Sequence, residues 1–371
     1  MLFYEYAKQG EEILKILQSS NKNLVLYGTG SIGNFIGRIM EAFISCYCVT
    51  KTENGSIEFN GMPVYEVESL PFDPDNTTII LTLDSKHWDS VEEGLSRHGY
   101  KDVVRATLDY QNALLSYYYL KIFELHDVSL EEAMINLNGT HIRNPLKMDE
   151  VDFKSVLIEM NDLVMGDIFS DVSMWSEGPY QFDQVLLKEG DVVFDCGANL
   201  GLFSCIAASK GCVSYAFEPT KRLYDDLKIC SDYYNNKIVP CNYALSDKTG
   251  VAELAMSPDW DVANTIVESS MNTIISKDGY EKYETVETIT IDDFVINHKI
   301  EKVDFIKADI EGAERYMLLG AVKTLSKMAP RLAICTYHFK DDPQVLEEII
   351  MKANPNYIVK HKWKKLYAYV K

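Results

Sequence analysis

The chain has 371 residues, of which 47% are hydrophobic and 25% are charged, a composition typical of a globular protein with about two domains. Its 36 basic and 56 acidic residues give a formal charge of −20, and this field argues against a nucleic-acid partner because it repels polyanions. The sequence contains neither a bilayer-length apolar run nor the pattern of a secretory signal, so we expect a cytoplasmic protein with no membrane span.

The first part of the chain predicts a small Rossmann-like α/β domain over residues 1–107. Helical spacing of apolar residues over 11–19 is followed by a short apolar strand and a glycine-rich turn, and strands then alternate with helices. The predicted strands cover 23–27, 44–49, 63–65, 78–82 and 102–105, and a helix is predicted over 34–43.

The turn after the first strand matches the Gly-x-Gly-x-x-Gly fingerprint of dinucleotide sites. Glu53 stands where a ribose-binding acid is expected, but the preceding strand ends in Val49-Thr-Lys51 without the carboxylate typical of NAD sites. The block resembles the small domains attached to sugar-modifying transferases. A nucleotide or nucleotide-sugar site and an empty structural or dimerising domain both stay open. The candidate ligand-binding residues are Gly28, Gly30, Ser31, Ile32 and Gly33.

Residues 108–180 are predicted to form a mostly helical connector, and 181–371 a second α/β domain. This domain ends differently from a dinucleotide fold, because two alternating strands over 355–361 and 365–370 predict an antiparallel hairpin. Such an end is typical of a class I methyltransferase sheet. The strands predicted before it cover 191–196, 213–217, 237–241, 284–290, 303–308 and 331–337.

The most informative motif is a buried strand that ends in Asp195 and leads into a glycine-rich loop and a helix. The glycines allow close approach of a ligand, and Glu218 ends the next strand where ribose hydroxyls would lie. An acidic residue before the first glycine and Asn199 within the loop favour S-adenosylmethionine over a dinucleotide.

Several segments together resemble the FkbM family of S-adenosylmethionine-dependent methyltransferases, over residues 178–371. The resemblance implies O-methylation, commonly of hydroxyls on sugars, glycolipids, polysaccharides or polyketides. The segments that carry it are Asp195-Cys-Gly-Ala-Asn-Leu-Gly-Leu-Phe-Ser204, Phe217-Glu-Pro219, Asn242-Tyr-Ala-Leu-Ser-Asp247, Thr290-Ile-Asp-Asp-Phe294, Asp304-Phe-Ile-Lys-Ala-Asp-Ile-Glu-Gly-Ala-Glu314 and Ile334-Cys-Thr-Tyr-His338.

The predicted cofactor site combines this loop with neighbouring strand ends. The resemblance suggests that the segment around Tyr180 folds over the cofactor carboxylate, and Asn242 lies where the adenine edge is expected. The predicted cofactor-binding residues are Tyr180, Asp195, Gly197, Ala198, Asn199, Gly201, Glu218, Asn242, Ala244 and Asp309.

The predicted catalytic residues are His338, Asp309 and Glu311. Sugar hydroxyls are weak acids, so a neutral imidazole at His338 is expected to take the proton, with Asp309 assisting. The eight cysteines form no Cys-x-x-Cys pair and are expected to be buried, reduced thiols. We predict no metal, although a divalent ion held by Asp309 with His338 stays open.

The sequence as a whole predicts an S-adenosylmethionine-dependent O-methyltransferase that acts on a sugar, polysaccharide or glycolipid precursor. Two alternatives stay open: an NAD-dependent sugar-nucleotide oxidoreductase or epimerase, and a non-catalytic sugar-nucleotide-binding scaffold. The expected partners are a small-molecule or glycan acceptor, a nucleotide-sugar at the first domain, and a second copy of the chain in a homo-oligomer.

Overall fold

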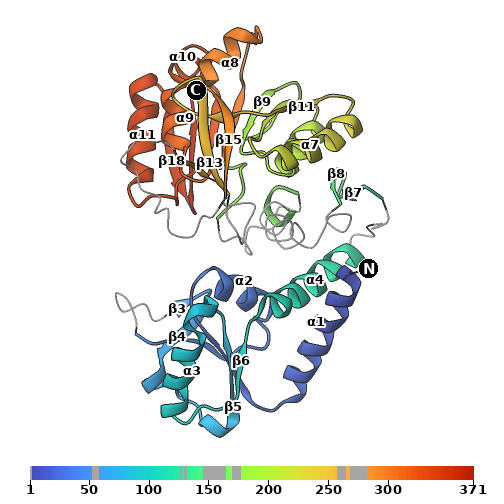
Figure 1. Cartoon of the computed structure of the whole chain (residues 1–371), viewed down its shortest axis with the longest axis vertical. Helices are drawn as coiled ribbons and strands as arrows, with labels where there is room; N and C mark the ends of the chain where they lie inside the picture. Colours follow the sequence, from blue (N-terminus) through green and yellow to red (C-terminus); the bar gives the residue numbers. More distant parts are fainter. Residues whose placement is uncertain are drawn as a thin grey trace. The chain divides into compact units, whose positions relative to one another are not determined.

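The computed structural model describes residues 2–51, 58–125, 128, 132–144, 164–168, 177–256, 265–267 and 282–371. Contacts divide the chain into two compact units, Met1–Asp127 and Val128–Lys371 (Figure 1).

The first unit contains a six-stranded sheet in the order β3-β4-β2-β1-β5-β6. Its neighbouring strands run parallel, except that β3 and β4 form an antiparallel pair. The strands are β1 (Asn23–Tyr27), β2 (Cys46–Val49), β3 (Glu58–Phe59), β4 (Met62–Glu66), β5 (Thr77–Leu81) and β6 (Val103–Arg105).

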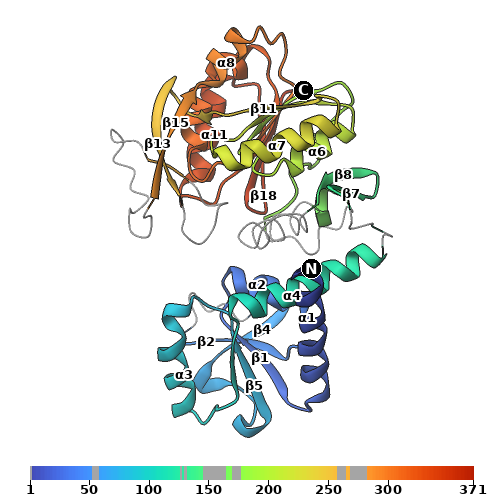
Figure 2. The same ribbon diagram turned by 45° about the vertical axis from the view of Figure 1, so that its right-hand side comes forward.

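Helices cover both faces of this sheet, which confirms the predicted small α/β fold. Figure 2 shows α1 and α4 on one side of the sheet and α3 on the other. The first face buries Leu14, Ile36 and Leu114 against the strands, and the second buries Leu95. The helices are α1 (Leu2–Ser19), α2 (Ser31–Ile39), α3 (Trp88–Arg97) and α4 (Leu108–Leu125), with 3-10 turns at Val67–Ser69, Pro74–Asn76 and Ser85–His87.

The second unit is built on a seven-stranded sheet in the order β11-β10-β9-β16-β17-β19-β18. Its first five strands are parallel, and β19 runs antiparallel between β17 and β18. The predicted methyltransferase-like sheet with a terminal hairpin is therefore confirmed. The strands are β9 (Val192–Cys196), β10 (Val213–Phe217), β11 (Ile238–Cys241), β16 (Phe305–Ala308), β17 (Arg331–Cys335), β18 (Ile358–Lys362) and β19 (Lys365–Tyr369).

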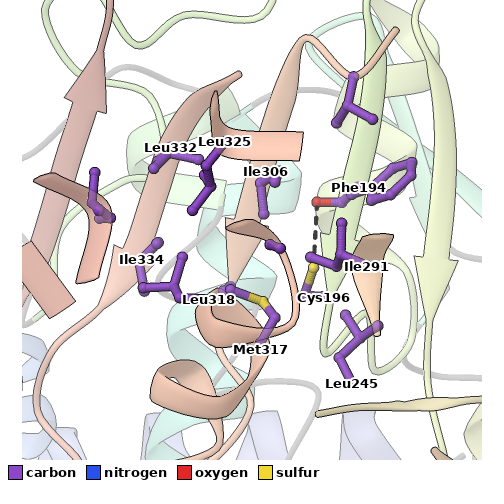
Figure 3. Close-up of a cluster of buried hydrophobic side chains, with 14 of the residues drawn as sticks. Phe194, Cys196, Leu245, Ile291, Ile306, Met317, Leu318, Leu325, Leu332 and Ile334 are labelled. Atoms are coloured by element: carbon purple, nitrogen blue, oxygen red, sulfur yellow. Dashed lines mark hydrogen bonds between the residues drawn. The ribbon is translucent and has the colours of Figure 1, made fainter. Parts of the chain in front are cut away.

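The central strands of this sheet are nearly continuous apolar runs because both faces are covered, as parallel sheets require. Figure 3 shows Ile306 and Ile334 of two neighbouring strands close to Met317 and Leu318 of a covering helix. The helices of the unit are α6 (Leu202–Ser209), α7 (Lys221–Tyr233), α8 (Ile291–Asn297), α9 (Glu314–Leu319), α10 (Val322–Lys327) and α11 (Asp342–Ala353), with a π-helical turn at Val164–Ile168.

A further four-stranded sheet, in the order β12-β15-β13-β14, belongs to the same unit. The strand predicted over 284–290 corresponds to β15 of this smaller sheet. It pairs antiparallel with β13 and is not part of the seven-stranded sheet. Its members are β12 (Ala244–Leu245), β13 (Gly250–Met256), β14 (Thr265–Val267) and β15 (Lys282–Ile289).

Residues 108–180 are predicted to form a mostly helical connector, but their described part contains an α-helix and an antiparallel strand pair that belong to different units. Helix α4 packs against α1 within the first unit. Strands β7 (Met134–Leu137) and β8 (Thr140–Arg143) form an antiparallel pair in the second unit. Tyr234 of the second unit donates a hydrogen bond to the His141 carbonyl at 2.7 Å, and β8 also contacts α6. Residues 145–163 lie outside the described residues.

Candidate functional site

The predicted site residues of the second unit gather along one edge of its large sheet. Gly197 follows β9, Glu218 follows β10, Asp309 follows β16 and His338 comes shortly after β17. These four strands are neighbours and parallel, so their carboxyl ends lie at the same edge. The strand order reverses between β9 and β16, which is where open α/β sheets bind their ligands.

The loop after β9 needs glycine at two positions. Gly197 has φ +75°, and a Cβ atom there would lie 2.0 Å from the Asp309 carbonyl oxygen. Gly201 has φ +78° and precedes α6 directly. Asn199, with φ +49°, adopts the same left-handed region, which asparagine tolerates better than most residues. The loop therefore passes closely over the end of β16 and leads directly into α6.

Glu218 is held by the same loop. Its carboxylate accepts hydrogen bonds from the Asn199 amide at 3.0 Å and from the Thr220 amide at 2.9 Å. Burial raises the pKa of Glu218, although these amides favour the ionised form. The amide of Ala198 donates to the Phe217 carbonyl at 2.9 Å, which ties the loop to β10.

Asp195 is paired within the core of the unit. Its side chain is fully buried and forms an ion pair with Lys307 of β16 at 3.1 Å. Its second oxygen accepts a hydrogen bond from Ser204 at 2.7 Å, and the Lys307 ammonium also donates to the Gly197 carbonyl at 2.5 Å. In this structure Asp195 therefore joins β9, β16 and the loop.

The strand end at Asn242 borders a cavity of about 520 Å³. The Asn242 side-chain amide donates to the Glu218 and Pro219 carbonyls at 2.8 and 2.9 Å. Ala244 is only 2% exposed and packs with Leu254 and Val286 of the smaller sheet. The residues that line the cavity include Tyr215, Tyr224, Tyr243, Phe294 and His298.

Asp309 is positioned by two tyrosines. Tyr180 donates a hydrogen bond to one carboxylate oxygen at 2.7 Å, and Tyr337 donates to the other at 3.1 Å. Burial by itself favours the protonated form, but the nearby charges of Lys307 and His338 outweigh it and hold the pKa of Asp309 below its usual range. The carboxylate is therefore ionised, and its orientation is set from both sides.

Three carboxylates surround the ring of His338. Nε2 lies 3.3 Å from the nearer oxygen of Glu311 and 3.7 Å from that of Asp309, while Nδ1 lies 3.3 Å from Glu314. Burial favours the neutral ring, but Glu311 and Glu314 outweigh it and raise the pKa of His338 to about 11. The imidazole in this environment is protonated at neutral pH, which does not favour its predicted role as a base.

Three residues of this site are absent from the predicted set. Lys307 and Tyr337 contact Asp195 and Asp309 respectively, and Glu314 lies against His338. Lys307 carries the clearest signal, because a lysine within the apolar strand Phe305-Ile-Lys-Ala needs a buried partner. Tyr337 stands next to His338 in the sequence, but its contact with Asp309 could not be predicted, because that partner follows another strand.

The predicted residues of the first unit also share one strand end. Gly28, with φ +118°, follows β1, and Ser31 begins α2. A Cβ atom at Gly33 would lie 2.1 Å from the Gly28 carbonyl oxygen, whereas one at Gly30 would meet nothing within 4 Å. Ile32 packs against the core beneath. Glu53 lies outside the described residues, and a nucleotide or nucleotide-sugar ligand here stays a prediction.

Residues 195–358 match the model of the family described as Methyltransferase FkbM domain. This stretch is an FkbM methyltransferase domain. It begins at Asp195 and includes the loop, Glu218, Asp309 and His338. The family implies S-adenosylmethionine as the cofactor, which confirms that prediction.

Two curated methyltransferases are each similar to part of this chain. The hexuronic acid methyltransferase AglP of Haloferax volcanii is 28% identical over 166 residues, which cover 45% of this chain and 64% of AglP. The 31-O-demethyl-FK506 methyltransferase FkbM of Streptomyces tacrolimicus is 27% identical over 161 residues, covering 37% and 61% of the respective chains. The match therefore spans less than two thirds of each relative.

Among solved structures, methyltransferase FkbM from Methylobacillus flagellatus KT aligns with 99% of this chain and 98% of its own, at 16% identity and a TM-score of 0.40. Within the described residues of our chain, no helix combines the length and the apolar composition that crossing a bilayer requires.

Proposed function

We propose that this chain transfers a methyl group from S-adenosylmethionine to a carbohydrate hydroxyl, with hexuronic acid residues as the first acceptor class. The FkbM domain supports the reaction, and the name of the relative AglP supports the acceptor class. The observation that carries the proposal is the close approach of the glycine loop to Asp309 at the end of β16, with Glu218 following β10 at the same edge of the sheet.

In this proposal, the amides at the start of α6 and the carboxylate of Glu218 bind the cofactor. Glu218 already accepts two amide hydrogen bonds, and its remaining lone pairs would receive the ribose hydroxyls. The cavity at Asn242 would take the adenine. The methionine part would then lie over the loop, with its sulfonium methyl near Asp309.

Glu311 is the proton acceptor we favour, in place of His338. Its side chain is 30% exposed, against 21% for Asp309 and 1% for Glu314. Both oxygens of Asp309 already accept tyrosine hydrogen bonds, so Asp309 suits orientation of the acceptor hydroxyl. The hydroxyl oxygen attacks the methyl carbon in line, the carbon–sulfur bond breaks, and the hydroxyl proton passes to the Glu311 carboxylate.

The test is a methyl-transfer assay with hexuronic-acid-containing glycans and neutral glycans, read out by mass and by release of S-adenosylhomocysteine. We expect the wild type to methylate hexuronate hydroxyls. We expect Glu311→Gln and Asp309→Asn to lower kcat by about 100-fold or more, while cofactor affinity changes by no more than a few fold.

Glu348→Gln, an exposed glutamate on α11, is the matched control and should keep full turnover. A wild type that binds S-adenosylmethionine but methylates no hydroxyl-bearing acceptor would contradict the proposal. Full turnover of Glu311→Gln would remove Glu311 as the proton acceptor.

A further inference from the structure

We propose that Asp309, Glu314 and His338 bind a divalent metal ion of the Mn²⁺ or Mg²⁺ type at the end of β16. The ion would hold the acceptor hydroxyl beside the donor methyl group, and only this role in catalysis rests on the proposed function. The site itself follows from the arrangement of the three side chains.

The three residues offer one ligand atom each, and these atoms all lie within 4.8 Å of one another. They come from separate elements: Asp309 from the end of β16, Glu314 from the start of α9 and His338 from the segment after β17. Because β16 and β17 are paired in parallel register, the two strand ends are held together by the sheet. Two carboxylates and one imidazole on such a frame form a common donor set for a divalent ion.

A second observation points to a ligand between them. Glu314 is only 1% exposed, and its Oε2 atom makes no hydrogen bond within the described part of the chain. The ring nitrogens of His338 lie 3.3 Å from the Glu311 and Glu314 carboxylates, without regular hydrogen-bond geometry. Buried polar atoms left without a partner are costly and call for an explanation, of which a bound ion is one.

The surrounding groups orient these ligands as outer-shell partners do in metal sites. Tyr180 and Tyr337 donate to the two oxygens of Asp309. The Ile310 amide donates to Oε1 of Glu314 at 2.8 Å, and Oε2 accepts no hydrogen bond within the described part of the chain. A ligating imidazole is neutral, so the metal ion would compete with a proton for the ring of His338 and displace it on binding.

The ion deepens the proposed mechanism without changing its balance. Coordination polarises the acceptor oxygen and lowers the cost of losing its proton. Glu311, next to His338 but outside the ligand set, receives that proton. The carbon–oxygen bond forms as the carbon–sulfur bond breaks, so the sulfonium becomes a thioether and no oxidant or reductant is needed.

The experiment is a titration of the full chain with Mn²⁺, without cofactor or acceptor, monitored by the electron paramagnetic resonance signal of free and bound Mn²⁺. We expect one Mn²⁺ per chain, displaced by excess Mg²⁺. Glu314→Gln and His338→Gln should each weaken binding about 10-fold or more. If substitution of the buried Glu314 lowers stability, Asp309→Asn tests the site at a more exposed ligand. Circular dichroism checks the fold of each variant.

Glu347→Gln is the matched control, because Glu347 forms a comparable but exposed pair with His361 at 2.7 Å. Its Mn²⁺ affinity should equal that of the wild type. A wild type that binds no Mn²⁺ up to about 1 mM, or equal binding by all the ligand variants, would overturn the metal site. Mn²⁺ binding by the wild type that is lost in the ligand variants supports the metal site, even if the wild type methylates no acceptor. Failure of the metal site and failure of the proposed function are therefore distinguishable.

Discussion

At the scale of single residues, carboxylates in this domain have different roles according to their partners. Asp195 is neutralised by buried Lys307, Glu218 accepts loop amides, and Asp309 accepts two tyrosine hydroxyls. Removing one member of a buried ion pair costs about 3–5 kcal/mol, so Asp195 contributes first to the fold of the loop. Glu218 and Asp309 both follow strands at the edge where open α/β sheets bind their ligands.

Glu218→Gln should weaken S-adenosylmethionine binding by about 10-fold or more at pH 8, because a hydrogen bond to a charged group contributes about 1.5–3 kcal/mol. In our proposal the ionised carboxylate accepts the ribose hydroxyls, and burial raises its pKa. Acidification should therefore weaken binding to the wild type at a higher pH than an exposed glutamate would allow. Isothermal titration calorimetry across pH measures this.

The glutamine side chain does not titrate, so the Glu218→Gln variant should lack this acid-side loss. A variant with wild-type affinity and the same pH profile would show that Glu218 does not contact the cofactor. Glu348→Gln serves again as the exposed control.

At the scale of elements, the glycine loop and the end of β16 form one structural unit. The Asp309 amide donates to the Cys196 carbonyl at 3.1 Å, and Lys307 donates to the Gly197 carbonyl. The loop before α6 and the end of β16, which we propose to bind the donor and the acceptor, are thus linked by hydrogen bonds. A substitution in the loop should therefore alter both the loop itself and the end of β16.

Gly197→Ala tests this link. A methyl group would lie 2.0 Å from the Asp309 carbonyl oxygen at a positive φ, so β16 and the loop must separate. We expect a loss of about 1–3 kcal/mol in unfolding free energy, together with weaker cofactor binding. Chemical denaturation and titration calorimetry measure the two effects.

Gly250→Ala is the control for that substitution, because the nearest atom to its Cβ would be 3.9 Å away. It should leave both quantities close to the wild-type values. Equal effects of the two substitutions would show that the tight approach at Gly197 does not limit the site.

At the scale of the whole molecule, the two units have separate hydrophobic cores. Ile80 is fully buried in the core of the first unit, and Ile306 in that of the second. The residues predicted to bind S-adenosylmethionine all lie in the second unit. A core substitution in the second unit should therefore affect cofactor binding more than one in the first unit.

Ile80→Ala and Ile306→Ala should each destabilise their own unit by about 2–5 kcal/mol, since both remove buried methyl groups. Ile80→Ala should leave cofactor affinity at 25 °C within two-fold of wild type, whereas Ile306→Ala should lower it. Differential scanning calorimetry and binding titration of the full chain check both. Loss of cofactor affinity in Ile80→Ala would contradict separate units.

The sequence alone was enough to predict both sheets, the terminal hairpin and the cofactor class. Apolar strands buried on both faces and glycines with positive φ leave local signals, and so do acids at strand ends. The eight buried, free cysteines also agree with expectation. The pattern of residues 284–290 predicted a strand but not the sheet to which it belongs. An alternating pattern is the same for a strand of either sheet.

Tertiary structure decided which charges meet. Asp195 pairs with Lys307 and His338 with three carboxylates only because parallel strands distant in sequence are neighbours in the sheet. Protonation and metal affinity depend on this local field and burial, which a residue's sequence neighbours do not specify. The sequence thus determined the cofactor class and the predicted donor residues, and the packing of β9, β16 and β17 determined which charges surround Asp309 and His338.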